Sequence, residues 1–340
     1  MQVTLKQLEG FIPSLLKASI VPFIKGSPAL GKSALAKSIA EKYHLKYIDV
    51  RLAECDPTDI SGLPYFNQKT GKATFYPFDT FPTEHDPIPE GYKGFLIMLD
   101  EFNSAPIATQ ASAYKLVLDR QVGQHRLHPN VVIIAAGNKE DDNAIVNPMS
   151  SALVSRFAHF EVVINQSDWN EWAAGNGIDY RITSYMNFKP DHLYTFHPDT
   201  ADQPYASPRT WAMLSRVIIG TKADTAMLPV LASLIGEGVA REFMTYLELQ
   251  DSLPTFEAIL KNPTGIDIKP DLSIRWALMG MIAHRINVDL VVPCTEFLNR
   301  FPDELRVVAI REIRLRHPKL LDDSKEFKQW ITKVAMQTFS

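Results

Sequence analysis

The stretch GSPALGKS at residues 26–33 constrains this chain more than any other part of its sequence. A loop that cradles phosphate needs glycines that let backbone N–H groups turn inward, a lysine for the β- and γ-phosphates, and a hydroxyl that ligates Mg²⁺. An apolar run at 20–24 precedes the loop, and an alanine-rich helical pattern begins near Lys32. This context predicts a strand, a phosphate loop and a helix whose N-terminus faces the anion. The residues expected to contact the nucleotide are Gly26, Ser27, Gly31, Lys32, Ser33 and Ala34.

Further short apolar runs alternate with helical patterns in the first half of the chain. They lie at 47–52, 95–99, 131–136 and 159–164. Continuous apolar runs of this length are typical of strands that are buried in a parallel sheet. Together with the run before the loop, they predict an α/β core with a five-stranded parallel sheet over residues 1–165. Helical periodicity dominates afterwards, so residues 166–340 are expected to form an α-helical lid and a C-terminal helical region.

Composition narrows the class of protein. The chain has 340 residues, 22% of them charged, and a formal net charge of −4, which excludes nucleic-acid binding through net charge alone. Cys55 and Cys294 are far apart and lack CxxC spacing, so a disulfide framework and a zinc ribbon are excluded. Charged residues interrupt the start of the chain, and no apolar run is long enough to span a bilayer. We therefore expect a cytoplasmic protein without a membrane segment.

An acidic pair ends the apolar run FLIML at 95–99. Asp100 and Glu101 follow it directly. Ligands of parallel sheets bind outside the carboxyl ends of the strands, so these acids are expected beside the phosphate loop. Asp100 would then hold Mg²⁺ together with Ser33, and Glu101 would polarise the attacking water. The alternative is a strand that ends in two solvated acids.

Three more polar residues follow predicted elements. Asn138 ends the run VVIIAAGN, where its amide could orient a water or contact the γ-phosphate. Arg156, in SRF, precedes the last strand, and Arg209, in SPRTW, begins a predicted helix. A guanidinium that meets the γ-phosphate stabilises transition-state charge. Taken singly, each of these residues also fits ordinary turn or surface chemistry.

The order of these motifs resembles an AAA+ ATPase, and more closely the MoxR-type branch with its CbbQ/NorQ-like relatives. The resemblance covers residues from about 20 to 220. It is carried by GSPALGKS, LDEFNSAP, LDRQV, AAGN, SRF and SPRTW, and by DPTDISGLP at 56–64. In this branch the last motif leads into an inserted β-hairpin, which is expected here at about 60–78. A second hairpin is expected at about 119–131, before Asn138.

The resemblance implies an αβα core that binds ATP and Mg²⁺, with Lys32, Ser33, Asp100, Glu101 and Asn138 in the roles given above. It also implies that Arg156 completes the site of a neighbouring subunit in a homomeric ring, a hexamer in this family. Arg209 would report the nucleotide state to the lid of its own subunit. Within the loop, the chain departs from the family at Ala29 and Leu30, where relatives are richer in glycine.

Two classes of client remain open at this stage. MoxR-type relatives commonly act with a von Willebrand factor A domain protein and help to mature metalloenzymes, which favours a protein-remodelling, chaperone-like ATPase. The alternative is a DNA-handling AAA+ motor or loader, for which the basic stretch RVVAIREIRLRHPK at 306–319 is the supporting feature. Glu312 interrupts that charge, so a solvated helix is the preferred interpretation. The hairpin aromatics Tyr65, Phe66, Phe75 and Tyr76 could grip a client, but we expect them to pack against their own core.

Overall fold

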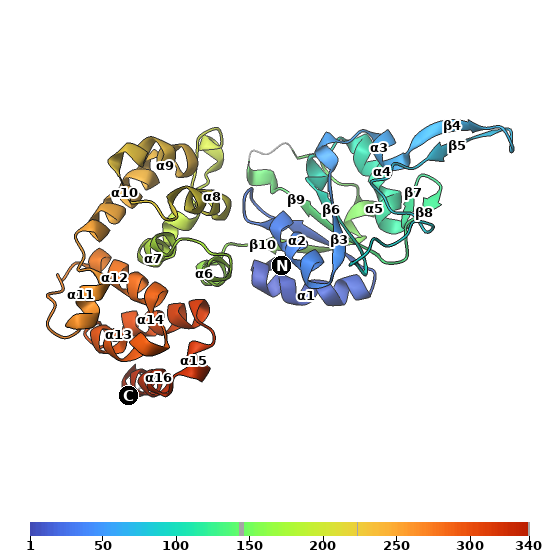
Figure 1. Ribbon diagram of the computed structural model, residues 1–340. Coiled ribbons are helices and arrows are strands. Elements are labelled where there is room, and N and C mark those ends of the chain that lie inside the picture. Colours follow the sequence, from blue (N-terminus) through green and yellow to red (C-terminus); the bar gives the residue numbers. More distant parts are fainter. Residues whose placement is uncertain (143–145, 223, 339–340) are drawn as a thin grey trace. The chain divides into compact units, whose positions relative to one another are not determined.

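The computed structural model describes residues 1–142, 146–222 and 224–338, which form two compact units (Figure 1). The first unit contains Met1–Ile164 and the short segment His197–Ala201. The second unit contains Asn165–Phe196 and Asp202–Ser340. The chain first passes from one unit to the other at Ile164, next to the position where the β pattern of the sequence ends.

A six-stranded sheet forms the centre of the first unit, and all of its strand pairs are parallel. Its strands, from one edge to the other, are β1 (Gln2–Val3), β10 (Phe157–Val162), β2 (Val21–Lys25), β9 (Val131–Gly137), β6 (Gly94–Asp100) and β3 (Leu45–Arg51). The predicted α/β core with a parallel sheet is thereby confirmed, and the five predicted runs are its five longer strands. The sixth strand has only two residues, too few to produce a recognisable apolar run.

Helices cover the sheet and place the loop. The α-helices of this unit are α1 (Leu5–Lys17), α2 (Lys32–Lys42), α3 (Pro57–Ser61), α4 (Ile107–Leu118) and α5 (Ser151–Val154). Its 3-10 helices are η1 (Leu52–Glu54), η2 (Phe102–Ser104), η3 (Glu140–Asp142) and η5 (Pro198–Thr200). Strand β6 is buried along its whole length up to the half-buried Asp100, as expected for a central strand with both faces covered.

Three aromatic rings in the core join the segments that carry the predicted site. Phe23 lies on β2, which leads into the loop, Phe102 directly follows the acidic pair, and Phe157 directly follows Arg156. The Phe102 ring packs edge-on against Phe23 and Phe157, with centroid distances of 6.2 and 5.3 Å. Such pairs stabilise by about 0.5–1.5 kcal/mol beyond burial of their area. The cluster therefore fixes the three segments relative to one another.

Two hairpins project from the same unit, in the segments where hairpins were predicted (Figure 1). Strands β4 (Leu63–Asn67) and β5 (Lys72–Tyr76) pair antiparallel, as do β7 (Gln121–Val122) and β8 (His125–Arg126). The Tyr65 and Tyr76 rings stack at 3.6 Å. Phe66 is 66% exposed and Tyr76 is 59% exposed, so the expectation that the hairpin aromatics pack against the core is wrong for these two. The β4–β5 sheet has only two strands, and these two rings lie largely in solvent.

Among its described residues, the second unit contains helices and no strand. Its α-helices are α6 (Gln166–Gly175), α7 (Tyr180–Phe188), α8 (Pro208–Ile218), α9 (Leu228–Ile235), α10 (Glu237–Asp251), α11 (Phe256–Lys261), α12 (Leu272–Arg285), α13 (Val291–Leu298), α14 (Asp303–Arg316), α15 (Leu320–Asp323) and α16 (Lys325–Thr338). Its 3-10 helices are η4 (Pro190–Leu193), η6 (Thr225–Met227) and η7 (Val288–Leu290). Two hydrophobic cores hold it together, one around Trp211 and Phe243 and one around Phe297 and Phe327. Among the helices described, none combines the length and the apolar character that crossing a membrane requires.

Candidate functional site

The loop at 26–33 connects β2 to α2. Gly31 lies at its end with φ 97°, a conformation that favours glycine, and it is the N-cap of α2 without a side-chain capping hydrogen bond. The first N–H groups of a helix have no intrahelical acceptor, and the helix dipole concentrates positive potential there. Ser33 and Ala34 lie in this first turn. The local fold therefore presents an N-terminus suited to phosphate.

Ala29 and Leu30 are the loop positions at which the resemblance led us to expect more glycine. Both side chains are buried. Ala29 has φ 62°, in the left-handed region, where a non-glycine residue costs about 1–2 kcal/mol. Glycine would adopt this backbone conformation without that cost.

Lys32 is the first residue of α2, and its side chain reaches back to the start of the loop. Its ammonium donates to the carbonyl oxygens of Gly26 at 2.6 Å and Ser27 at 3.0 Å, and to the Asn138 Oδ1 at 3.4 Å. The residue is only 8% exposed. A buried ammonium requires acceptors or an anion, and the contact with Asn138 brings the end of β9 to the loop.

Ser33 and Asp100 meet beside it. The Ser33 hydroxyl donates to the Asp100 Oδ2 at 2.5 Å, which brings the start of α2 to the end of β6. A hydroxyl and a carboxylate oxygen form the kind of donor set that Mg²⁺ accepts when phosphate and water complete its shell. The residues present therefore fit a Mg²⁺–nucleotide complex. No group of three or more His, Cys, Asp or Glu side chains among the described residues could hold a metal ion.

Glu101 has an unusual backbone conformation. Its φ of 53° is in the left-handed region, and its N–H donates to the Asp100 Oδ1 at 2.9 Å. Strained positions of this kind persist only where the surroundings enforce them, and they cluster at functional sites. Here the buried Phe102 and the Ser104 N–H, which donates to the Glu101 carbonyl at 2.9 Å, hold the turn. The turn separates the two acids, so that Asp100 ends the strand while Glu101 begins the next segment.

The Asp100 carboxylate also acts on two ionisable side chains of strand β3, Asp49 and Tyr47. Burial of the carboxyl group and, second, the nearby Asp100 carboxylate raise the pKa of Asp49. Burial and the same two carboxylates raise the pKa of Tyr47 as well. Anionic groups on adjacent strands disfavour one another's charge, and a cation bound at Asp100 would relieve this.

Asn103 is a positioning residue that the sequence analysis did not select. Its side chain is buried, its Oδ1 accepts from the Asn138 N–H at 2.9 Å, and its Nδ2 donates to the Asn138 carbonyl at 2.8 Å. This double contact fixes the backbone from which the Asn138 amide reaches Lys32. The signal in the sequence is a polar residue placed two positions after Glu101, next to the hydrophobic Phe102.

The close packing of the Asn103 side chain against Gly137 allows a test of this double contact. A Cβ there would lie 2.3 Å from the Asn103 Oδ1 and 2.7 Å from the Phe23 Cζ. Gly137→Ala is therefore expected to lower the unfolding free energy of the first unit by about 1–3 kcal/mol, as overpacking does. Thermal unfolding followed by circular dichroism would show the loss.

Gly10 on α1 is the matched control, because a Cβ there meets nothing within 4 Å. Gly10→Ala is expected to leave the unfolding midpoint unchanged or to raise it. Equal midpoints for the Gly137→Ala and Gly10→Ala proteins would contradict the close packing of Asn103 around Gly137.

Ser27 has a hydrogen-bond partner, Asp142, that the sequence analysis also did not select. Its hydroxyl donates to the Asp142 Oδ1 at 3.1 Å, and the Asp142 side chain is buried. The second carboxylate oxygen of Asp142 has no hydrogen-bond partner in the described part of the chain. Asp142 thus ties η3 to the loop.

The two predicted arginines take no part in these contacts. Arg156 is exposed, donates to the Ser155 Oγ at 2.6 Å, and has its guanidinium 6.0 Å from the centre of the Tyr114 ring. Arg209 is exposed near the start of α8 in the second unit, where Ser207 and Thr210 form a capping box. The structure therefore brings together Gly26, Ser27, Lys32, Ser33, Asp100 and Asn138, with Glu101 adjacent, and the hydrogen bonds that join them include neither arginine.

Comparisons with known proteins leave the family open. No protein-family model and no curated protein matches the chain. Its similarity to a candidate ATPase from Cytophaga hutchinsonii covers 98% of this chain and 89% of that one, with 14% identity and a TM-score of 0.36. A mutant form of Thermotoga maritima RuvB is 16% identical over 76% of each chain, with a TM-score of 0.40. The Thermotoga maritima RuvB Holliday junction branch migration motor is also 16% identical over 76% of each chain, with a TM-score of 0.37. Similarities this distant assign no activity to the chain.

Proposed function

We propose that this chain is a Mg²⁺-dependent ATPase of the AAA+ class and of MoxR type. One observation carries the proposal: Lys32, the Ser33–Asp100 pair and Asn138 meet at the carboxyl ends of β2, β6 and β9. A buried lysine at a glycine-ended loop, a metal-ligand pair and a polar amide are the parts that phosphoryl transfer to water requires.

Each residue has a role in this proposal. The α2 N-terminus and Lys32 bind the β- and γ-phosphates, and Ser33 and Asp100 would hold the metal. Mg²⁺, when bound, neutralises charge on the β- and γ-phosphate oxygens. Glu101 accepts a proton from the attacking water, and Asn138 orients that water. Asn103 holds Asn138 in place through the two contacts described above.

Arg156 is proposed to act in the site of a neighbouring subunit. Its guanidinium is at the surface, held over Tyr114 and Ser155. An exposed arginine outside the contacts of its own site is suited to complete a partner's site in a homomeric ring, which we propose to be a hexamer. Arg209 would couple the nucleotide state to the helical lid formed by the second unit.

A protein is the proposed client. The exposed Phe66 and Tyr76 of the first hairpin offer apolar surface of the kind that contacts an extended chain. The chaperone-like role, with a von Willebrand factor A domain partner or a metalloenzyme client, follows from the resemblance of the motifs to the MoxR-type branch.

The basic helix α14 gives the nucleic-acid alternative little support. The Arg306 guanidinium contacts Asp303 and the Gln337 Oε1. The Arg311 guanidinium donates to the Asn187 Oδ1, and that of Arg316 donates to the Thr183 Oγ1. Contacts within the chain thus already engage cations that a phosphate backbone would need. A protein client is therefore preferred.

Capture of the client tests the proposal. Full-length Glu101→Gln protein purified with ATP and Mg²⁺ should retain ATP and a protein client, because hydrolysis no longer releases them. The matched control combines Glu101→Gln with Lys32→Ala, which is expected not to load nucleotide. A protein held by the first variant and not by the second supports the proposal. Nucleic acid held in the same nucleotide-dependent way at moderate salt would replace it with the DNA-handling alternative.

A further inference from the structure

A pocket of about 670 Å³ lies within the second unit, and the proposed function does not use it. Its walls come from the α6–α7 connection and the start of α7, the residues after α8, α10, α12 and the end of α14. The polar and charged residues among them include Asp179, Arg181, Lys222, His284, Arg316 and His317. Ligand pockets typically have volumes of about 300–1,000 Å³, so the size suits a small organic molecule.

One part of the wall is a closed ion pair. The Arg181 Nη2 lies 2.7 Å from the Asp179 Oδ2, and both side chains are nearly buried. The Arg181 guanidinium also donates to the carbonyl oxygens of Ile218 at 2.6 Å and Thr221 at 2.9 Å. Arg181 is thereby fixed and its charge is compensated, so this pair shapes the pocket without making it cationic.

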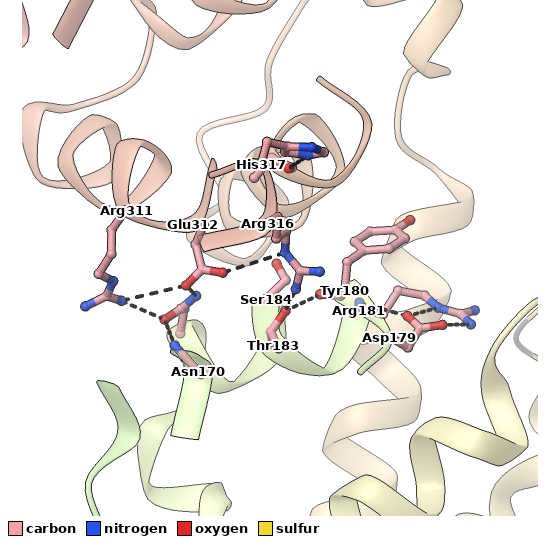
Figure 2. A network of polar contacts seen from close by, with 12 residues as sticks. Asn170, Asp179, Tyr180, Arg181, Thr183, Ser184, Arg311, Glu312, Arg316 and His317 are labelled. Carbon is pink, nitrogen blue, oxygen red and sulfur yellow. Dashed lines mark hydrogen bonds and ion pairs between the residues drawn. The ribbon is translucent and has the colours of Figure 1, made fainter. Parts of the chain in front are cut away.

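Arg316 is the loosely compensated cation of the wall. Its side chain is only 10% exposed, and its Nη2 donates to the Thr183 Oγ1. The Glu312 Oε2 is 3.9 Å from the Arg316 Nε, beyond hydrogen-bond distance. Figure 2 shows the Arg316 side chain projecting from α14 toward α7.

Glu312 does not neutralise this cation fully. Its Oε1 lies 3.9 Å from the Arg311 Nη2, so two arginines share one carboxylate (Figure 2). Burial raises the pKa of Glu312, and burial lowers the pKa of Arg316. Burial disfavours the charged forms of both groups. An anion in the pocket would supply negative charge close to the Arg316 guanidinium.

The rest of the wall suits a flat, apolar group. The His284 and Tyr180 rings stack with centroids 4.8 Å apart and an interplanar angle of 13°. The side chains of Ile178, Ile219 and Leu247 also line the pocket. Partial burial and, second, the nearby Arg316 charge lower the pKa of His284, which favours the neutral form of its ring.

We propose that this pocket binds a small phosphate monoester that carries a ring. Beside the closed Arg181–Asp179 pair, the wall holds the nearly buried Arg316 guanidinium, whose Nε stays 3.9 Å from the Glu312 Oε2, and a dianion would compensate this charge. The phosphate group lies at Arg316, where a guanidinium can donate to two oxygens. The ring lies on the Tyr180–His284 stack. All of these residues belong to the second unit, and none is used by the nucleotide loop, so this proposal stands or falls independently of the ATPase.

Calorimetric titration of the full-length Lys32→Ala protein tests the proposal, since this background removes binding at the nucleotide loop. Phenyl phosphate is the probe, inorganic phosphate is the anion without a ring, and benzoate is the monoanion with a ring. Phenyl phosphate is expected to bind at one site and more tightly than either of the others. Absence of saturation up to about 10 mM, where a millimolar ligand saturates, would overturn the proposal. Equal affinity for benzoate would also overturn it.

Variants locate the site. Arg316→Gln should weaken phenyl phosphate about tenfold or more, because a charged hydrogen bond is lost. Arg314→Gln is the matched control, since Arg314 is exposed on the same helix and does not line the pocket. His284→Ala, at an exposed position, should weaken phenyl phosphate but not inorganic phosphate. If the Arg316→Gln protein does not fold, the His284→Ala protein still tests the proposal. Unchanged binding of phenyl phosphate by the His284→Ala protein would contradict the assigned pocket.

Discussion

Replacement of Glu101 by glutamine is expected to slow ATP turnover by about 10²–10⁴-fold while ATP binding persists, because general-base assistance is worth that much. Glutamine keeps the shape of the side chain but cannot take a proton from water. Glu101 is half-buried and follows Asp100 through a turn with φ 53°. The residues proposed to bind phosphate and metal are Lys32, Ser33 and Asp100, and the contacts that join them do not involve the Glu101 side chain.

Release of phosphate in the steady state measures turnover, and equilibrium binding of a labelled nucleotide measures affinity. Glu90→Gln is a matched control, since Glu90 is exposed in a loop outside the site. The assignment of Glu101 is contradicted if its glutamine variant hydrolyses ATP at the wild-type rate. Loss of binding together with turnover would instead indicate that the strained turn at Glu101 supports the loop.

The sequence predicted those parts of the site that depend on local patterns. The loop, its helix and the acids at the end of β6 are each determined by a few neighbouring residues. An apolar run indicates a strand, and the polar residue that follows the run indicates where the strand ends. The parallel sheet then requires these ends to lie at one edge. The contacts of Lys32 with Asn138 and of Ser33 with Asp100 agree with this expectation.

Contacts between distant segments were not predictable in this way. Asn103 acts on Asn138 only because β9 lies beside β6, an adjacency that no local pattern encodes. The same holds for the pocket of the second unit, where Arg181, His284 and Arg316 come from three different helices. In the sequence, Arg316 was one charge on a basic helix.

The prediction for the hairpin aromatics was wrong for another reason. Aromatic residues are usually buried, and that tendency led to the wrong expectation for Phe66 and Tyr76. Strands β4 and β5 pair only with each other. Phe66 and Tyr76 stay largely exposed on this two-stranded sheet, and the Tyr76 ring stacks on that of Tyr65. A sequence reveals the alternation but not whether a second layer exists.

Replacement of Arg156 by alanine is expected to reduce ATP turnover about 10³-fold or more, the usual contribution of an arginine that reaches a transferring phosphoryl group. The structure holds the Arg156 guanidinium at the surface over Tyr114, outside the contacts of Lys32. The proposed role of this residue in stabilising the transition state is therefore assigned to the site of a second subunit. Arg126→Ala, at another exposed arginine of the first unit, is the control and should leave turnover unchanged.

Mixing of two inactive variants separates action across an interface from a structural effect. In a ring of Arg156→Ala and Lys32→Ala subunits, the first variant contributes intact loops and the second contributes intact arginines. Every interface that pairs the loop of one with the arginine of the other regains a complete site, so turnover should reappear and peak at intermediate ratios. If Arg156 acted within its own subunit, each chain would lack one essential group whatever its neighbour. Absence of rescue at every ratio, with mixed assembly verified, would therefore contradict the proposed role between subunits.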